Sequence, residues 1–508
     1  MDASDRLDDR HVPSELDAEE FRRLGHGVVD EIADFLRSLP ERRVAPGESP
    51  EEVRAALGRD GLPELGMPAD ELLGEAGRLL FEHSTFNGHP RFFAYITSSA
   101  APIGALGDLL AAAVNPNVAG WPLAPLATEL EAQTIRWIAE LLGYPQDCGG
   151  LLVSGGNMAN FVCFLAARRA RAPWDVRSHG MAAGEARPLR VYGSAETHTW
   201  VQKATDLFGL GTAAIRWVET DREQRLLVPA LRELIAEDRA AGAVPLLVIG
   251  TAGSVSTGAV DPLDEIAEVC REEEIWFHVD GAYGAPAAVL SDAPSELKAL
   301  AQADSIAIDP HKWLYAPLEA GCALVRHPLA LVDTFSYRPP YYTLPEGEDA
   351  PISYVDYGPQ NSRGFRALKV WLGLRQAGRE GYVRMISDDI ALARELHRLA
   401  AADPELEAWT SSLSITTFRY VPAGVEPGSP ETERYLNELN RELLERLEHG
   451  GEAFLSNAVV GETYLLRACV VNFRTSRADV EALPEIVKRV GAEVHAGRSF
   501  QAPPGRRR

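Results

Sequence analysis

The segment Ile275-Trp276-Phe277-His278-Val279-Asp280 is a short apolar run that ends in a carboxylate. It follows a helix-like segment, 263–273, and a second β-rich run, 305–308, comes after it. Short β-rich runs that alternate with helices predict a mostly parallel sheet covered by helices on both faces. In such a sheet, the side chains that follow the strands gather at the carboxyl edge, where active sites lie.

The same alternation extends over residues 100–375. Strands are predicted at 151–153, 189–192, 245–249, 275–279 and 305–308, with helices at 158–168, 229–238 and 263–273. The pattern predicts an α/β fold in which the strands carry the functional side chains.

Both ends of the chain have a different pattern. An amphipathic helix starts near Ser14 and Asp17 and carries apolar residues from Phe21 to Phe35, and two more helices are predicted at 51–57 and 69–81. After Gly378 we predict a long helix, strands at 412–421 and 463–473, and helices at 431–448 and 478–494. The expected domains are a helical dimerisation arm, 1–100, a large domain, 101–377, and an α+β domain, 378–508, with a frayed tail from 502.

Composition limits the possible partners. The 508 residues include 50 Lys+Arg and 74 Asp+Glu, a net charge of −24, and no basic block, which argues against nucleic-acid binding. The start is acidic and no apolar run reaches the ~18 residues of a membrane span, so neither a secretory leader nor a membrane segment is expected. Five cysteines without a Cys-x-x-Cys pair indicate reduced thiols in a cytoplasmic protein.

The most informative motif is Asp309-Pro310-His311-Lys312-Trp313, directly after the predicted strand 305–308. A lysine between a histidine and an indole is partly desolvated, and such an amine is a usable nucleophile that can form a Schiff base with a carbonyl cofactor. Taken alone, the same lysine could equally be a solvated residue after a turn. The neighbouring motifs favour the chemical interpretation.

Two of these motifs also follow strands. Asp280 can hold a pyridinium nitrogen protonated, whereas a magnesium site of the P-loop type would need a Gly-x4-Gly-Lys-Ser/Thr loop that the sequence lacks. Ser154-Gly155-Gly156-Asn157 opens the helix 158–168, so its backbone amides predict an anion site, although glycine turns without a chemical role are equally common.

The other histidine and glycine motifs give weaker evidence for a functional site. His198 follows the strand 189–192 and would lie over a bound group, although a lone histidine is more often a core residue. Gly209-Leu210-Gly211 follows a helix-like segment instead of a strand, which argues against a nicotinamide dehydrogenase. The histidine spacing matches no metal motif, so no metal site is predicted.

Taken in order, the glycine turn, His198, Gly250-Thr251, residues 278–283 and His311-Lys312-Trp313 resemble the group II pyridoxal-phosphate decarboxylases of the aromatic-L-amino-acid decarboxylase type. The similarity includes 89–95, 128–131 and 363–369 and covers nearly the whole chain. It implies an α/β, fold-type-I enzyme, similar to aspartate aminotransferase, that acts as a homodimer with pyridoxal 5′-phosphate as cofactor.

The resemblance also implies a role for each motif. Lys312 would hold the cofactor, Asp280 would pair with the pyridine nitrogen, and His198 would stack on the ring. The other implied cofactor contacts are Ala282 on the opposite ring face, Gly155, Gly156 and Asn157 at the phosphate, Thr251 beside the cofactor, and His311 at the phosphate or the substrate carboxylate. Tyr341 matches the family's mobile-loop tyrosine that supplies a proton, with Tyr337 and Tyr342 as competitors.

The sequence departs from the family in two places. Asp309 stands where relatives often carry a neutral Asn or Ser beside the phosphate, so its carboxylate must point away, bind a donor or be protonated. The positions expected around the substrate side chain are less aromatic and more polar than in aromatic decarboxylases. They are Asn87, Ile96, Thr97, Asn117 and Ala119.

The expected function is decarboxylation of an L-amino acid, with an aromatic amino acid as the first choice and aspartate, glutamate or diaminobutyrate as alternatives. A decarboxylating aldehyde synthase is a second alternative, which Tyr341 argues against because those relatives carry phenylalanine there. A catalytically silent binding protein on the same fold is a third, which the intact Lys312, Asp280 and His198 argue against.

Overall fold

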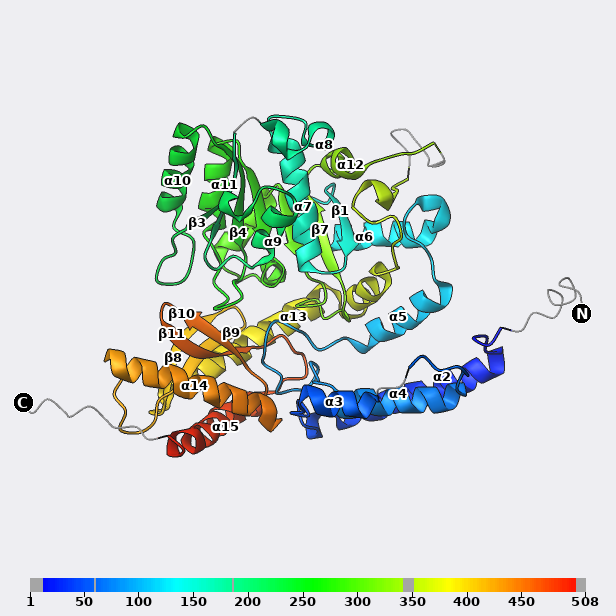
Figure 1. Ribbon diagram of the computed structural model, residues 1–508, viewed down its shortest axis with the longest axis vertical. Coiled ribbons are helices and arrows are strands. Elements are labelled where there is room, and N and C mark those ends of the chain that lie inside the picture. The colour runs from blue at the N-terminus through cyan, green and yellow to red at the C-terminus, as the bar shows by residue number, and fades with distance from the viewer. Residues whose placement is uncertain (1–11, 59–60, 185–186, 341–350, 499–508) are drawn as a thin grey trace, which may run out of the picture.

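The computed structural model describes residues 12–58, 61–184, 187–340 and 351–498. Figure 1 shows a large α/β body, with the C-terminal sheet and the N-terminal helices lying along one side of it. Helix α13 (Ala367–Ala402) runs between these two layers. It joins the body that carries the site to the C-terminal unit that supports it.

The large body contains a seven-stranded sheet in the order β1-β7-β6-β5-β4-β2-β3. Strand β7 is antiparallel to β1 and β6, and every other neighbouring pair is parallel. The strands are β1 (Gly149–Val153), β2 (Leu189–Ser194), β3 (Ile215–Val218), β4 (Val244–Thr251), β5 (Trp276–Asp280), β6 (Ser305–Ile308) and β7 (Gly321–Val325). The mostly parallel α/β sheet that the sequence predicts is confirmed.

Helices cover the sheet and bury its central strands. Every residue of β1, β5, β6 and β7 is buried, as expected where both faces are covered. The helices of this body are α5 (Pro102–Val114), α6 (Pro125–Leu141), α7 (Gly156–Arg171), α8 (Val176–His179), α9 (Trp200–Leu207), α10 (Val228–Ala240), α11 (Leu263–Glu272) and α12 (Leu329–Phe335). Helix α7 contacts five strands directly, β1, β4, β5, β6 and β7, so the glycine turn at its start is held against the sheet edge.

All five predicted strands are present, and the sequence missed β3 and β7. Strand β3 has four residues and lies at the sheet edge, where Arg216 and Trp217 are not buried, so its apolar pattern is weak. Strand β7 begins Gly-Cys-Ala, and these residues have low or neutral strand propensity.

The C-terminal unit is a four-stranded antiparallel sheet, in the order β10-β11-β9-β8, packed against helices. Its elements are β8 (Leu406–Ser412), β9 (Ile415–Tyr420), α14 (Pro430–Gly450), β10 (Ser456–Val460), β11 (Thr463–Cys469) and α15 (Arg477–Ala496). The strand predicted at 412–421 is confirmed as β9, but the prediction missed β8 and the reversal of the chain at Leu413-Ser414 between the two strands. Leu413 has φ +47, a conformation that no Gly or Asn announces in the sequence.

The long helix predicted after Gly378 begins earlier, at Ala367. Gly378 interrupts α13 with φ +65 and ψ 173, values outside the helical region. Glycine reaches this conformation without the steric cost of a side chain. Before the break, Trp371 donates to Gln133 of α6, and after it the carbonyl of Ala393 accepts a hydrogen bond from Thr416 of β9. The break therefore separates a part of α13 beside α6 from a part that contacts the C-terminal sheet.

The N-terminal helices are α2 (Ala18–Ser38), α3 (Pro50–Leu57) and α4 (Ala69–His83), and α4 packs against both of the others. Asp17 caps α2 by accepting the N–H groups of Glu19 and Glu20, and Phe35 stacks on Phe81 with 4.8 Å between ring centroids. The chain therefore covers part of the predicted amphipathic face itself, while Phe21 remains 54% exposed. Across the described residues, we find no helix with the length and apolar character needed to cross a membrane.

Candidate active site

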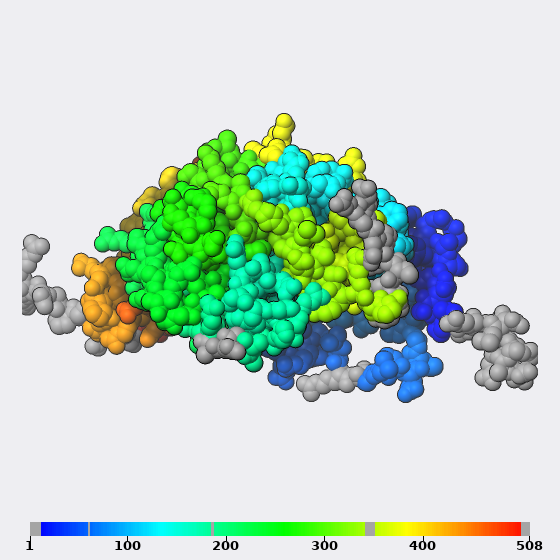
Figure 2. All heavy atoms as spheres, turned by 90° about the horizontal axis from the view of Figure 1, so that it is seen from above, coloured from blue at the N-terminus to red at the C-terminus, as the bar shows by residue number. Residues whose placement is uncertain are grey.

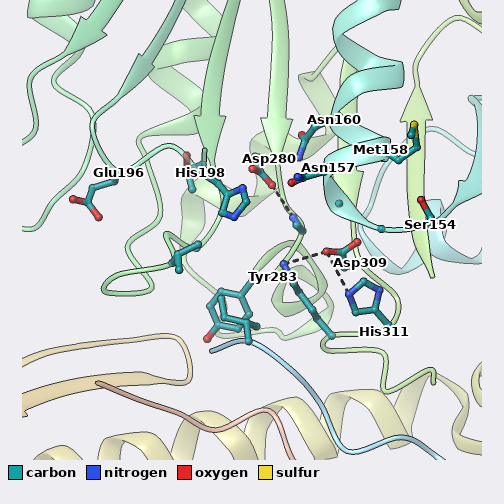
Figure 3. A pocket seen from close by; sticks show the side chains of 18 residues that line it. Ser154, Asn157, Met158, Asn160, Glu196, His198, Asp280, Tyr283, Asp309 and His311 are labelled. Atoms are coloured by element: carbon teal, nitrogen blue, oxygen red, sulfur yellow. Dashed lines mark hydrogen bonds and ion pairs between the residues drawn. The ribbon is translucent and has the colours of Figure 1, made fainter. Parts of the chain in front are cut away.

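A pocket lies where the carboxyl ends of the strands meet (Figure 3). Its lining comes from the turn after β1, from the segments that follow β2, β4, β5 and β6, and from Ile96. The predicted residues that line it are Gly155, Gly156, Asn157, His198, Thr251, Asp280, Ala282, His311 and Lys312. Tyr341 and Tyr342 lie outside the described residues. The parallel sheet thus brings together motifs that are widely separated in the sequence.

Lys312 forms an ion pair within its own turn. Its Nζ lies 3.1 Å from Oδ2 of Asp309, and its backbone N–H donates to the Asp309 carbonyl over 2.8 Å. The lysine side chain is 20% exposed and that of Asp309 is 3% exposed. Of the three possibilities that the sequence left open for Asp309, the structure shows that this carboxylate binds a donor.

Asp280 ends β5 and is oriented by two donors. The indole Nε1 of Trp200 donates to its Oδ2 over 2.8 Å, and the backbone N–H of Ala282 donates to its Oδ1 over 3.2 Å. Both bonds stabilise the ionised carboxylate and fix its direction. The sequence analysis missed Trp200; its only signal was an indole two residues after His198, at the start of a helix.

His278 supports Trp200 from behind the site. The two rings meet edge to face with centroids 5.6 Å apart, and the ring nitrogens of His278 lie 2.7 Å from Oδ1 of Asn160 and 2.9 Å from Oγ of Ser305. Burial lowers the pKa of His278 to about 4, against the opposing effect of Asp280. A neutral His278 leaves the charge of Asp280 available to a group in the pocket.

His198 contributes its ring to the pocket (Figure 3). Burial lowers its pKa from the ordinary value, and the nearby Asp280 opposes that shift. A neutral imidazole can lie flat against an aromatic ring without adding a cation to the site. The structure therefore gives His198 a position and a protonation state that suit the stacking role implied by the resemblance.

The glycine turn brings backbone close to its neighbours. Gly155 has φ +148, and a side chain on Gly321 of β7 would meet the backbone of Gly155 at 2.5 Å. A side chain on Gly156 would lie 2.7 Å from Oδ2 of Asp309. Helix α7 starts here without a side-chain cap, so its first N–H groups are available to an anion.

His311 and Thr251 are held by local hydrogen bonds. Nδ1 of His311 lies 2.7 Å from the carbonyl oxygen of Ala320, and burial lowers the pKa of this histidine while Asp309 opposes the shift. The backbone N–H of Thr251 donates to Asp261 over 2.8 Å. The hydroxyl of Thr251 is buried and has no hydrogen-bond partner among the described residues, so it is free to bind a ligand.

The turn that carries Lys312 is braced from two distant segments. Trp313 stacks on Tyr283 with centroids 4.9 Å apart, and the hydroxyl of Tyr283 is hydrogen-bonded to Ser414 at the tip of the β8–β9 hairpin. Trp313 also donates from Nε1 to Asp389 of α13 over 2.8 Å. The C-terminal unit therefore helps to fix the position of the lysine.

The residues present fit pyridoxal 5′-phosphate. The uncapped amides at the start of α7 suit the phosphate, the amine of Lys312 suits the aldehyde, and Asp280 suits the ring nitrogen. Three buried side-chain oxygens on residues that line the pocket have no partner among the described residues: Glu196 Oε2, Thr251 Oγ1 and Asp309 Oδ1. Such orphaned groups are expected where a polar ligand completes the site.

The five positions that the sequence analysis expected around the substrate mostly do not line the pocket. Of the five, only Ile96 lines the pocket within this chain. The side chain of Asn117 accepts the N–H of Arg363, and the carbonyl of Ala119 accepts the N–H of Val355. The lining includes Glu196, Val255 and Tyr283, which the sequence analysis did not select.

Comparison with known proteins agrees with this geometry. The family model for the pyridoxal-dependent decarboxylase conserved domain matches residues 50–421. An aromatic-L-amino-acid decarboxylase from Bacillus atrophaeus is 35% identical, over 94% of this chain and 97% of its own length. A phenylacetaldehyde synthase from a Rosa hybrid cultivar is 31% identical, over 90% of each chain.

A solved structure extends the similarity to the whole fold. The structure of Oryza sativa TDC with PLP and tryptamine superposes with a TM-score of 0.87 at 30% identity, covering 95% of this chain and 99% of the other. The family match spans more than half of the residues, and the pocket contains a lysine, an aspartate and a glycine turn that fit the cofactor. The chain belongs to the pyridoxal-dependent decarboxylases, lyases that remove carbon dioxide from amino acids.

Proposed function

We propose that this enzyme decarboxylates an aromatic L-amino acid to the amine and carbon dioxide, with Lys312 as the cofactor-binding lysine. The observation that carries the proposal is that Lys312, Asp280 and the glycine turn line one pocket at the carboxyl edge of the sheet. Bound pyridoxal 5′-phosphate supplies an electron sink for the bond to the carboxylate. The roles of the protein groups follow from their positions.

Asp280 keeps a proton on the cofactor's ring nitrogen, and Trp200 holds the carboxylate in place for that task. His198 would lie on one face of the ring and Ala282 on the other. Gly155, Gly156 and Asn157 would hold the phosphate with backbone N–H groups. Thr251 and His311 complete the polar wall with side chains that face the pocket.

The proton that completes the amine comes from Tyr341 in this proposal. Of the competing tyrosines, Tyr337 is described, and it is 67% exposed with the guanidinium of Arg177 3.8 Å above its ring. Tyr337 does not line the pocket. This contact favours Tyr341 or Tyr342 as the donor over Tyr337.

The pocket chemistry supports an aromatic over an acidic substrate. Ile96, Val255 and Tyr283 give apolar surface, and Glu196 adds a carboxylate. Among the described lining residues there is no arginine to pair with a second substrate carboxylate. The relatives named for aromatic-L-amino-acid, tryptophan and tyrosine decarboxylation support the same choice.

We also propose that the enzyme is a homodimer whose arm, 1–100, packs on the partner, with a large domain at 101–377 and a C-terminal domain from Gly378. Apolar side chains on α5 and the arm are exposed in the single chain, and a second copy would cover them. They include Phe21, Ile32, Leu72, Leu106, Leu109 and Leu110. The five free cysteines support a cytoplasmic location. Light scattering after gel filtration tests the dimer, and a monomeric mass would overturn it.

The test of function is a panel of L-amino acids incubated with purified protein and pyridoxal phosphate, with amine products identified by mass spectrometry. Phenylalanine, tyrosine, dihydroxyphenylalanine and tryptophan should give amines, whereas aspartate, glutamate and diaminobutyrate should not. Lys312→Ala is the control for uncatalysed reaction. Aldehyde and ammonia in place of amine would support the aldehyde synthase alternative, and the similarity to the Rosa phenylacetaldehyde synthase is the reason to test for them.

A further inference from the structure

Asp309 places a carboxylate at the start of α7, where the fold favours an anion. A side chain on Gly156 would lie 2.7 Å from Oδ2 of Asp309, so the carboxylate lies against the first residue of the helix. The uncapped N–H groups of that helix are the proposed phosphate site. Asp309 and the phosphate would therefore be neighbouring anions in a buried place.

The positive charge available to Asp309 is limited. Oδ2 lies 3.1 Å from Nζ of Lys312 and 3.8 Å from Nε2 of His311, while Oδ1 is buried without a hydrogen-bond partner in the described part of the chain. The other titratable groups that face Asp309 are His198 across the pocket, beside Asp280, and Cys322 on β7. Lys312 is thus the one described cation within hydrogen-bond distance of this carboxylate.

We propose that Asp309 makes binding of the cofactor's phosphate group proton-coupled, taking up one proton when the phosphate occupies the start of α7. The inference rests on the proposed role of the glycine turn. Two anions this close cannot both stay ionised without cost, so one accepts a proton from solvent. The unpartnered Oδ1 is the oxygen that can carry this proton, and the resulting O–H can donate to a phosphate oxygen.

Proton uptake gives the phosphate group a distinctive pH dependence. Binding that takes up a proton weakens as pH rises, and this effect is confined to ligands that carry the phosphate. Pyridoxal forms the same covalent link to Lys312 but has no phosphate. The ratio of the dissociation constant of pyridoxal to that of pyridoxal 5′-phosphate therefore isolates the phosphate contribution, because effects on the lysine cancel.

The experiment measures both dissociation constants by absorbance titration between pH 6.5 and 8.5 for the wild type and Asp309→Asn. In the wild type the ratio should fall with pH, by up to tenfold per unit, the limit for one proton. In Asp309→Asn the ratio should change little with pH, and at pH 8 it should be about tenfold higher than in the wild type. Asp403→Asn, which removes a carboxylate 2.7 Å from Lys488 outside the pocket, is the matched control and should behave as the wild type.

An equal pH dependence of the ratio in the wild type and Asp309→Asn would overturn the proposal. If Asp309→Asn fails to fold, as judged by circular dichroism, Asp309→Ser replaces it. A measurement on the wild type alone also tests the proposal. In weakly buffered solution at pH 8 with an indicator dye, binding of pyridoxal 5′-phosphate should take up close to one more proton per site than binding of pyridoxal. Equal uptake refutes the inference. Failure of the proposed site is a different result, because no borohydride-reduced adduct would then form on Lys312.

Discussion

Trp200 and Asp280 are 80 positions apart in the sequence and are joined by a hydrogen bond of 2.8 Å from the indole Nε1 to Oδ2. Both side chains are buried, and the rings of Trp200 and His278 meet edge to face. The orientation of the carboxylate proposed to hold the cofactor's ring nitrogen therefore depends on a tryptophan from the helix after His198.

Trp200→Phe should lower turnover by roughly ten- to a hundredfold, because a hydrogen bond to a charged group contributes about 1.5–3 kcal/mol. The variant should keep its bound cofactor. Trp371→Phe, which loses an indole bond of 2.7 Å to Gln133 away from the pocket, is the control and should retain full activity. Steady-state kinetics and cofactor absorbance measure both effects, and an unchanged kcat in Trp200→Phe would exclude the orienting role.

Asp280→Asn keeps the shape of the side chain and removes its charge. We expect cofactor to remain bound but turnover to fall by roughly a hundred- to a thousandfold, the usual effect of removing one preorganised electrostatic contact. The measurement is amine formation per bound cofactor. Activity within a few fold of the wild type would mean that another group protonates the ring nitrogen.

Tyr341→Phe tests the proton donor. Loss of a general acid typically lowers a rate by about 10²–10⁴, and a slowed protonation leaves more time for reaction with oxygen, so the product should shift from amine towards aldehyde, ammonia and peroxide. Tyr337→Phe and Tyr342→Phe are compared under the same conditions. If Tyr341→Phe alters neither rate nor product ratio, Tyr342 becomes the next candidate.

Asp389 should make stability depend on pH. Burial raises its pKa to about 7, although Tyr315 and Trp313 donate hydrogen bonds that oppose the shift. The unfolded chain has a carboxyl pKa near 3.9, so the folded state binds more protons between about pH 4 and 7, and this group's contribution to stability falls as pH rises through that range.

Asp389→Asn should therefore lose less stability than the wild type between pH 5 and 8. The difference is up to roughly 3 kcal/mol, because about two pH units of the titration, from pH 5 to 7, fall inside this interval at 1.36 kcal/mol each. Melting temperatures of both proteins at pH 5, 6, 7 and 8 measure it. Parallel pH profiles would show that Asp389 stays ionised throughout this range.

The sequence predicted what is local along the chain. The central strands were visible because buried strands are short and apolar, and the site motifs were visible because each follows a strand directly. Edge strand β3 was missed because it has only four residues and only the two at its ends are buried. The β8–β9 hairpin was missed because its turn at Leu413-Ser414 has no glycine or asparagine.

The long-range hydrogen bonds that hold the active-site residues in place could not be predicted from the sequence. Trp313 is 76 positions from Asp389, and Tyr283 is 131 positions from Ser414, yet each pair is hydrogen-bonded. No spacing rule connects such positions, since the contacts depend on how the C-terminal unit docks. The partner of Asp309 was undecided for a related reason: a turn can place a carboxylate in several directions, and only the folded structure shows that this one meets Lys312.

The pocket walls draw on residues from Ile96 to Lys312, and Ser414 braces them from behind. An unfolded chain holds these groups apart, so the cofactor binds the folded chain alone and favours folding by mass action, by about 2.7 kcal/mol when it is present at a hundred times its dissociation constant. A shortage of the cofactor during biosynthesis should therefore leave a larger unfolded fraction of this protein open to proteolysis. Enzyme abundance in a cell would thus follow the concentration of a small molecule, even when transcription and translation are constant.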